Sequence, residues 1–203
     1  MTMSVNYIKI DQDIVDSLRG LYFGSVVDKF SAAVNRAYRD FNRTLLFGET
    51  TKEKRIQLRE RAKAYLEEGF DSLNQIQNQK EFDAWHKKLG NKLISLYASE
   101  GITFTYGQAQ KWINMTAKYL YLIGAYTFEN VFQYLHVPID NYVMDIAEEK
   151  FKLEKPELPW SQWDYEGYKN YQLSLRKLIQ DKGLDPLRWE FRNWLESARG
   201  FEN

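Results

Sequence analysis

Apolar side chains recur every three or four residues along most of this chain, which is the period of a helix with one buried face. Between Ile14 and Tyr22, for example, the apolar positions are 14, 15, 18, 21 and 22. Equivalent patterns predict helices over residues 26–41, 52–70, 82–98, 107–122, 143–147, 171–180 and 187–198. Residues 71–78 are rich in Gln and Asn and indicate a link or a frayed helix end. The chain is therefore predicted to be almost entirely helical.

Proline positions agree with this pattern. All four prolines lie in the last third of the sequence and each falls at a predicted boundary, so helices can run uninterrupted before them. A length of 203 residues favours one domain with a substantial core. We expect an all-α, compact multi-helix domain over residues 1–203. It can divide into two helical lobes, one of residues 1–80 with the C-terminal helices and one of residues 81–150.

Composition excludes several kinds of chemistry. The chain has no cysteine, which removes disulfides, thiolate zinc sites, cysteine nucleophiles and cysteine-bound iron–sulfur clusters. With His86 and His136 as the only histidines, we expect no metal site, and no cofactor-binding motif is present. Residues 1–10 lack a signal-peptide pattern, and no apolar run reaches the roughly 18 residues that span a bilayer. We expect a cytoplasmic protein without membrane contact.

Charge is balanced overall but uneven along the chain. There are 28 basic and 28 acidic residues in total, yet residues 85–125 hold five lysines and a single acid, Glu100. Residues 129–157 reverse the sign, with seven acids and three lysines. The basic segment also carries amide and hydroxyl donors, which could hold a phosphodiester backbone. A solvated helix face would explain the same lysines.

The turn before the helix over 143–147 holds the lead catalytic candidate. Pro138 fixes its own φ and pushes Val137 towards an extended conformation, so Asp140 is placed at the predicted helix start. Such a carboxylate has a fixed position, which chemistry needs. The alternative is that Asp140 only caps the helix.

The order helix 82–98, short loop 101–106, helix 107–122 and then Val137-Pro138-Ile139-Asp140 resembles the helix-hairpin-helix DNA glycosylase superfamily. The resemblance covers residues 85–150. In that family an Asp in a Pro-x-Asp turn carries the chemistry, and a Gly-x-Gly hairpin holds a DNA phosphate. Here Gly101 and Gly107 lie six residues apart with Thr and aromatic residues between them, so the hairpin departs from the family pattern.

This resemblance implies an enzyme that hydrolyses the N-glycosidic bond of a damaged or modified base flipped from double-stranded DNA. Asp140 would stabilise the cationic sugar and activate water. Lys111 would attack the sugar in a bifunctional enzyme or contact phosphate in a monofunctional one, and we favour the monofunctional enzyme. The remaining DNA-binding candidates are Thr105, Tyr106, Gly107, Gln108, Gln110 and Lys118.

Aromatic residues make up 16 per cent of the chain, and a flipped base needs aromatic faces to stack on. The candidates for the base pocket are Trp112 and the proline-flanked Trp160 and Trp163, together with His136. Each has an ordinary alternative. Aromatic residues at helical spacing usually fill a core, and a lone His beside an apolar turn is usually a packed structural residue.

Other classes of function stay open. A non-catalytic helical module that binds a nucleotide, nucleic acid or protein, as in phage–host conflict, would use the same aromatic residues without chemistry. A structural protein would use them at oligomer interfaces, although we infer no obligate protein partner. A hydrolase that pairs Asp140 with Asp145, Glu148 or Glu149 is a further alternative, to which the spacing gives no special support.

Overall fold

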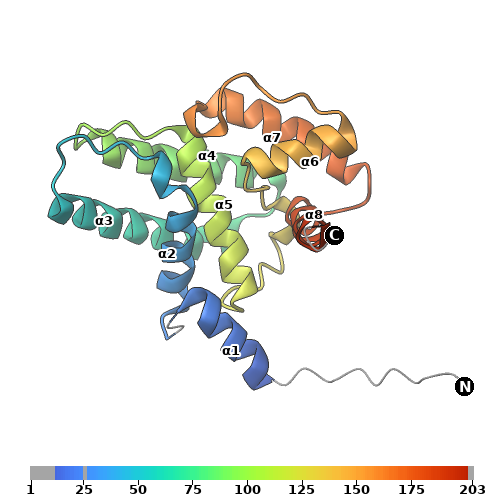
Figure 1. Ribbon diagram of the computed structural model, residues 1–203, viewed down its shortest axis with the longest axis horizontal. Helices are drawn as coiled ribbons and strands as arrows, with labels where there is room; N and C mark the ends of the chain where they lie inside the picture. Colours follow the sequence, from blue (N-terminus) through green and yellow to red (C-terminus); the bar gives the residue numbers. More distant parts are fainter. Residues whose placement is uncertain (1–11, 25–26, 201–203) are drawn as a thin grey trace, which may run out of the picture.

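The computed structural model describes residues 12–24 and 27–200, with side chains as far as residue 196. Its helices are shown in Figure 1, and the described residues contain no strand. The α-helices are α1 (Gln12–Phe23), α2 (Lys29–Phe41), α3 (Lys52–Asp71), α4 (Gln79–Ala98), α5 (Tyr106–Leu122), α6 (Asn141–Phe151), α7 (Tyr165–Gln180) and α8 (Pro186–Gly200). Short 3-10 helices are η1 (Asn42–Thr44), η2 (Ser72–Gln75), η3 (Phe132–Tyr134) and η4 (Trp160–Gln162). The prediction of an all-α protein is confirmed.

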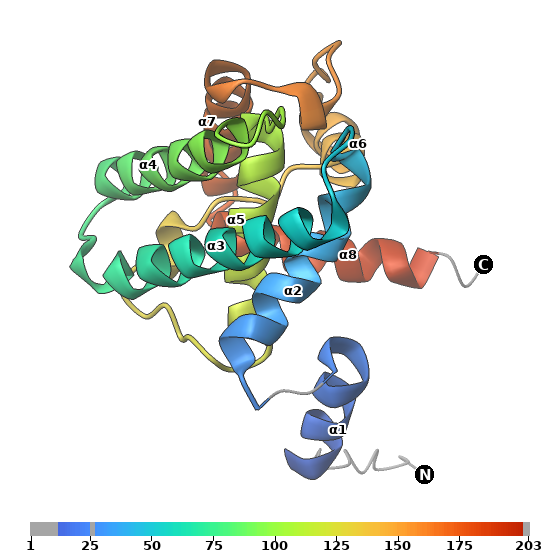
Figure 2. The ribbon, with the colours of Figure 1, turned by 90° about the vertical axis from the view of Figure 1, so that its left-hand side faces the viewer.

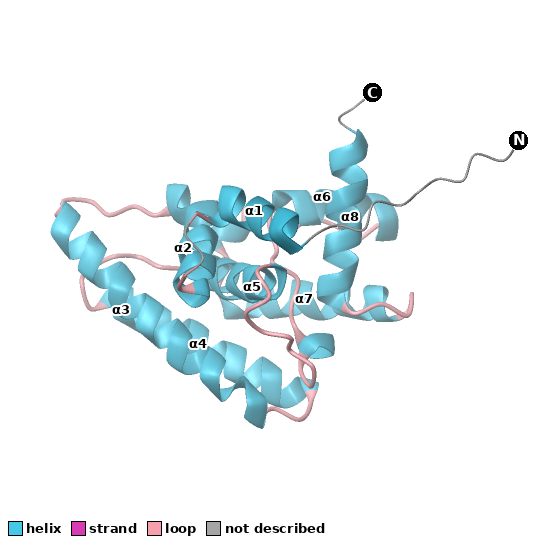
Figure 3. Cartoon of the chain, turned by 90° about the horizontal axis from the view of Figure 1, so that it is seen from below, coloured by secondary structure: helices cyan, strands magenta, loops and turns pink. Residues whose placement is uncertain are grey.

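Helix α5 occupies the centre of the molecule. It packs against α2, α4, α7 and η4, and Figures 1 and 2 show the other helices arranged around it. Helices α3 and α4 pack side by side on one flank, as seen from below in Figure 3. The buried apolar side chains form one continuous core that runs from Ala33 to Trp189.

Burial of α5 on every side is the main departure from the sequence pattern. Each residue from Tyr106 to Leu120 is buried, including polar residues that helical periodicity assigns to an outer face. Lys111 and Lys118 are only 4 and 7 per cent exposed to solvent. The alternative of a solvated lysine face on this helix is therefore wrong. Charged side chains are rarely buried without partners, and both lysines form ion pairs, Lys111 with Asp140 and Lys118 with Glu190.

Helix starts are set by local caps. The side chain of Asp140 accepts a hydrogen bond from the Val143 amide at 2.9 Å, so Asp140 is the N-cap of α6 as expected. Thr105 and Gln108 form a capping box at the start of α5. These caps fix the orientation of the two elements that carry Lys111 and Asp140.

The proline-flanked aromatic segment folds inward. Trp160 and Trp163 are 6 and 3 per cent exposed, and η4 lies directly on the start of α5. A Cβ atom on Gly107 would lie 1.8 Å from the carbonyl oxygen of Trp160, so only glycine permits this approach. The segment is part of the core and is not a free stacking loop.

Helix α1 lies at the edge of the molecule and contains no buried residue. The Arg19 Nε donates to the Leu122 carbonyl at 3.2 Å, and the rings of Phe23 and Tyr119 meet edge to face at 5.4 Å. Few side chains thus connect α1 with the core. Its inner face covers one side of the cavity described below.

Candidate functional site

Lys111 and Asp140, which are 29 residues apart in the sequence, form an ion pair. The Nζ of Lys111 is 2.6 Å from Oδ2 of Asp140 and 3.2 Å from the carbonyl oxygen of Pro138. The Lys111 side chain is 5 per cent exposed, whereas that of Asp140 is 31 per cent exposed. The Asp140 carboxylate is therefore fixed by the Lys111 ammonium group and by the Val143 amide of α6, while about a third of its side chain remains exposed.

Two further α5 side chains hold the turn that carries Asp140. The Gln110 amide donates to the Ile139 carbonyl at 2.8 Å and accepts from the Ile139 amide at 3.3 Å. Asn114 Nδ2 lies 3.3 Å from the Val137 carbonyl and 3.0 Å from the side-chain oxygen of Gln110. Because the backbone of residues 137–140 is fixed by α5, the position of Asp140 relative to Lys111 is fixed too.

The open side of Asp140 faces a cavity of about 820 Å³. Residues of α1, α2, η1, α5, α6 and α8 line it, so segments far apart in the sequence contribute. Six cationic side chains stand against three carboxylates in this lining. The cations are Arg19, Arg36, Arg39, Arg43, Lys111 and Lys118, and the carboxylates are Asp40, Asp140 and Glu190.

Most of these charges are already paired. Lys118 Nζ is 2.6 Å from the Glu190 carboxylate, and both side chains are buried. Arg36 lies 3.0 Å from Asp40, which also accepts a hydrogen bond from the Tyr119 hydroxyl at 2.7 Å. Burial raises the pKa of Tyr119 far above its usual value, so its phenol remains a donor. These ion pairs and the hydrogen bond from Tyr119 fix the positions of the side chains that line the cavity.

Arg39 and Arg43 are the exception. Both are exposed, both line the cavity, and neither has an ion pair among the described residues. Two unpaired guanidinium groups near a carboxylate of fixed position suit an anionic ligand, and guanidinium matches phosphate in a bidentate geometry. Neither arginine lies in the basic segment 85–125 that the sequence predicted as the phosphate-binding region. The spacing of Arg36, Arg39 and Arg43 was the available signal, since residues three and four apart share a helix face.

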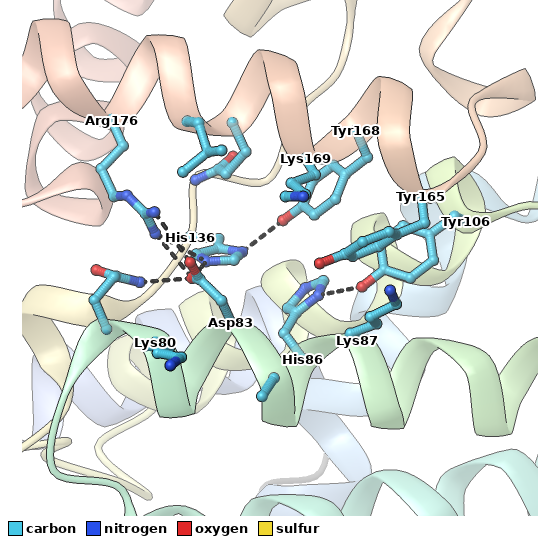
Figure 4. A pocket seen from close by; sticks show the side chains of 14 residues that line it. Lys80, Asp83, His86, Lys87, Tyr106, His136, Tyr165, Tyr168, Lys169 and Arg176 are labelled. Carbon is cyan, nitrogen blue, oxygen red and sulfur yellow. Dashed lines mark hydrogen bonds and ion pairs between the residues drawn. The ribbon is translucent and has the colours of Figure 1, made fainter.

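His136 lies elsewhere. It lines a second cavity of about 530 Å³ between α4 and α7, shown in Figure 4, with Tyr106, Tyr168 and His86. Hydrogen bonds connect the Tyr106 hydroxyl to His86 at 2.8 Å, His86 to Asn114 at 3.0 Å, Asn114 to the Tyr168 hydroxyl at 3.1 Å and that hydroxyl to His136 at 2.7 Å. His136 and Asp140 therefore line different cavities, although they are four residues apart in the sequence.

A partly buried salt bridge lies at the end of this series of hydrogen bonds. Asp83 contacts His136 Nε2 at 2.8 Å and both terminal nitrogens of Arg176, at 2.9 and 3.0 Å. Burial alone would raise the pKa of Asp83, but the hydrogen bonds from His136 and Arg176 lower it well below its usual range. Burial lowers the pKa of both His86 and His136. Neutral imidazoles are consistent with this series of hydrogen bonds, since each ring then donates from one nitrogen and accepts at the other.

The other predicted site residues have internal partners. Trp112 is fully buried and its indole nitrogen donates to the Val34 carbonyl, so it belongs to the core and not to a base pocket. Trp163 likewise donates to the Leu158 carbonyl. The structure thus corrects the assignment of Trp112, Trp160 and Trp163 to a stacking surface, because their faces are covered by protein.

The hairpin candidates are also used internally. The Gly107 amide donates to the Trp163 carbonyl at 3.0 Å, and the Thr105 hydroxyl donates to the Ser161 carbonyl at 2.7 Å. The Gln108 side chain donates to the Thr44 carbonyl, and Tyr106 is 2 per cent exposed. These donors are therefore occupied within the protein. Of the predicted site residues, Lys111, Lys118 and Asp140 meet in one cavity.

Among the described residues, no cluster of three or more His, Asp or Glu side chains could hold a metal ion. No helix in that part of the chain combines the length and the apolar character needed to cross a membrane. No protein-family model matches the chain, and no match was found among curated proteins or solved structures.

Proposed function

We propose that this protein is a DNA N-glycosylase that hydrolyses the bond between sugar and base at a damaged or modified nucleotide flipped from duplex DNA. One observation carries the proposal. Asp140 is fixed by its own helix and by Lys111, and its open side faces a large cavity that contains two unpaired arginines. A carboxylate held in this way suits the stabilisation of a developing cation.

The cavity fits the proposed substrate in size and charge. A volume of about 820 Å³ lies within the range of ligand pockets and exceeds what one extruded nucleotide needs. Arg39 and Arg43 would contact the flanking phosphates. Tyr22 and Trp194, which are about half exposed, offer aromatic surface for the base.

In the proposed reaction the C1′–N bond breaks and its electron pair leaves with the base, which takes up a proton. Positive charge develops on the sugar, where the Asp140 carboxylate stabilises it. Water then adds its oxygen to C1′ and gives a proton to the carboxylate. Lys111 donates to the Pro138 carbonyl and to Asp140 together, so we assign it the orientation of the carboxylate.

The Asp140→Asn substitution tests this assignment. Asn caps helices about as well as Asp and leaves an oxygen near Lys111, so the protein should still fold, with a melting temperature lowered by loss of the negative charge beside buried Lys111. The excision rate should fall at least about a hundredfold because the negative charge is lost. The assay incubates the protein with duplexes that carry alkylated, oxidised, deaminated or hypermodified bases and then cleaves abasic sites with mild alkali.

Asp145→Asn is the matched control. Asp145 lies on the same helix, is 64 per cent exposed on its side chain and pairs with Lys155 outside the cavity. This variant should excise at the normal rate. If Asp140→Asn excises as fast as the control, Asp140 is only a helix cap. Binding of modified duplex without excision of any base would favour a non-catalytic binding module.

A further inference from the structure

The cavity around His136 has no part in the reaction proposed above, yet it has the features of a ligand site. It encloses about 530 Å³ and is lined by residues of α4 and α7, with Tyr106 and His136 (Figure 4). Neither Lys111 nor Asp140 contributes to it. We propose that this cavity binds a nucleotide unit, with the phosphate at its exposed lysines and the base at its aromatic and amide groups.

The lysines of the cavity are available for an anion. Lys80 and Lys87 are exposed, and neither has an ion pair among the described residues. Lys169 has a 3.6 Å contact with Glu166, one turn away on the same helix, which is a weak exposed pair. The lining contains one carboxylate, Asp83, and Arg176 already neutralises it. The positive charge of the three lysines is therefore not compensated within the cavity.

Buried amide groups in the lining lack partners. Gln172 is 2 per cent exposed, and neither its side-chain nitrogen nor its oxygen has a hydrogen bond among the described residues. The side-chain oxygen of Gln79 is also buried without a partner. Nearly all buried polar groups are hydrogen-bonded, so these three unpaired amide atoms in one cavity lining need an explanation. Rotation of these side chains towards the cavity would let a ligand that both donates and accepts, as the edge of a base does, satisfy them.

An aromatic ring completes the arrangement. Tyr165 is partly exposed, its ring meets that of Tyr106 edge to face at 5.0 Å, and the Lys87 Nζ lies 3.9 Å from its centre. Figure 4 shows Lys87, Tyr165 and Tyr106 together on one side of the cavity. Aromatic rings with adjacent cations are typical of nucleotide sites, because the base stacks while the phosphate is neutralised. A simple inorganic anion would use the lysines alone.

Binding can be measured by titration calorimetry on the full chain with dAMP, dCMP, dGMP and dTMP, the four parent nucleosides and inorganic phosphate. At least one mononucleotide should bind, and its nucleoside and phosphate alone should each bind at least tenfold more weakly. Gln172→Leu removes the unpaired amide at similar volume, so it should lower affinity at least tenfold with an unchanged or higher melting temperature. The double variant Lys80→Ala/Lys87→Ala should lower both affinity and its dependence on salt.

One control and one comparison separate this cavity from the proposed active site. Lys177→Ala, an exposed position on α7 outside the lining, should leave mononucleotide affinity unchanged. Loss of binding in Arg39→Ala/Arg43→Ala with normal binding in Gln172→Leu would place the mononucleotide in the other cavity. Displacement of the mononucleotide by an unmodified eight-residue single strand would identify a nucleotide within DNA as the ligand. Failure of the strand to compete would identify a free nucleotide. Either result supports the site.

Three results would overturn the proposal: no binding of any mononucleotide at millimolar concentration, normal binding by Gln172→Leu, or loss of binding in Arg39→Ala/Arg43→Ala alone. None of these measurements involves base excision. The nucleotide site and the glycosylase assignment can therefore fail independently.

Discussion

The surroundings of Lys111 change the role that the sequence predicts for it. From the sequence it was a candidate for phosphate contact or for attack on the sugar. In the structure its side chain is 5 per cent exposed and its Nζ contacts Asp140 and the Pro138 carbonyl. An ammonium group fixed between two acceptors is a poor phosphate anchor. Its position could not be predicted, because no local pattern reveals a pair separated by 29 residues.

The Lys111→Met substitution tests whether Lys111 orients the Asp140 carboxylate or attacks the sugar. Met keeps most of the side-chain length and removes the ammonium group, so excision should fall at least about tenfold as Asp140 loses its orienting partner. Stability should fall by no more than about 1 kcal/mol, since Asp140 remains partly hydrated. Excision is measured by alkali cleavage and stability by thermal unfolding.

Borohydride treatment during turnover completes that experiment. A monofunctional enzyme forms no imine, so wild-type protein should give no covalent DNA adduct. An adduct that forms with wild-type protein and disappears in Lys111→Met would show that Lys111 is a nucleophile, and the monofunctional assignment would then be wrong.

At the level of elements, periodicity predicted the helices well because most of them bury one apolar face. The predicted spans of 52–70, 82–98 and 107–122 correspond closely to α3, α4 and α5. Periodicity does not reveal a helix that is buried on all sides. Helix α5 is buried all round because Gln110, Lys111 and Asn114 find partners inside the protein. The sequence around Trp160 and Trp163 predicted a surface loop. The contact of η4 with Gly107 buries this segment, and no local pattern reveals a contact between residues so far apart in the sequence.

Gly107→Ala tests the contact between η4 and α5. The added Cβ would meet a backbone carbonyl at 1.8 Å, which cannot move aside as a flexible side chain can. We expect a loss of at least about 3 kcal/mol, the upper end of the overpacking range. Gly20→Ala, in α1 with nothing within 4 Å of its Cβ, is the control and should stabilise by up to about 1 kcal/mol. Similar melting temperatures for both variants would contradict the packing described here.

The hydrogen-bond chain between α4, α5 and α7 predicts a stability that depends on pH. The pKa values of His86 and His136 are lowered on folding, so below about pH 6.5 the unfolded chain binds more protons than the folded chain. Stability should be constant above that pH and decrease below it, by at most about 2.7 kcal/mol per pH unit for two histidines.

Thermal unfolding between pH 5 and 8 measures this slope. His136→Gln should reduce it, because Gln donates and accepts but does not titrate there, while Asp83 and Arg176 remain to pair with each other. A melting temperature that does not change with pH across this range would mean that neither histidine is buried in its neutral form.

For the whole molecule, net charge and local charge lead to opposite expectations. The chain is neutral, which gives no reason to expect DNA binding, yet the cavity beside Asp140 has twice as many cations as carboxylates. Its arginines come from α1, α2 and η1, and its lysines from α5, so only the folded chain brings them together. The local count of lysines at 85–125 therefore identified part of the charge but not its location.

Arg39→Ala/Arg43→Ala is the corresponding test of the molecule as a DNA-binding protein. If both guanidinium groups contact phosphates, duplex affinity should fall and the slope of log affinity against log salt should become shallower by about 0.9 for each lost contact. The control is Lys54→Ala, an exposed position on α3 that does not line the cavity. Binding can be followed by fluorescence anisotropy from 50 to 200 mM salt. An unchanged slope in the double variant would place DNA away from this cavity, and Asp140 would then lose its proposed substrate.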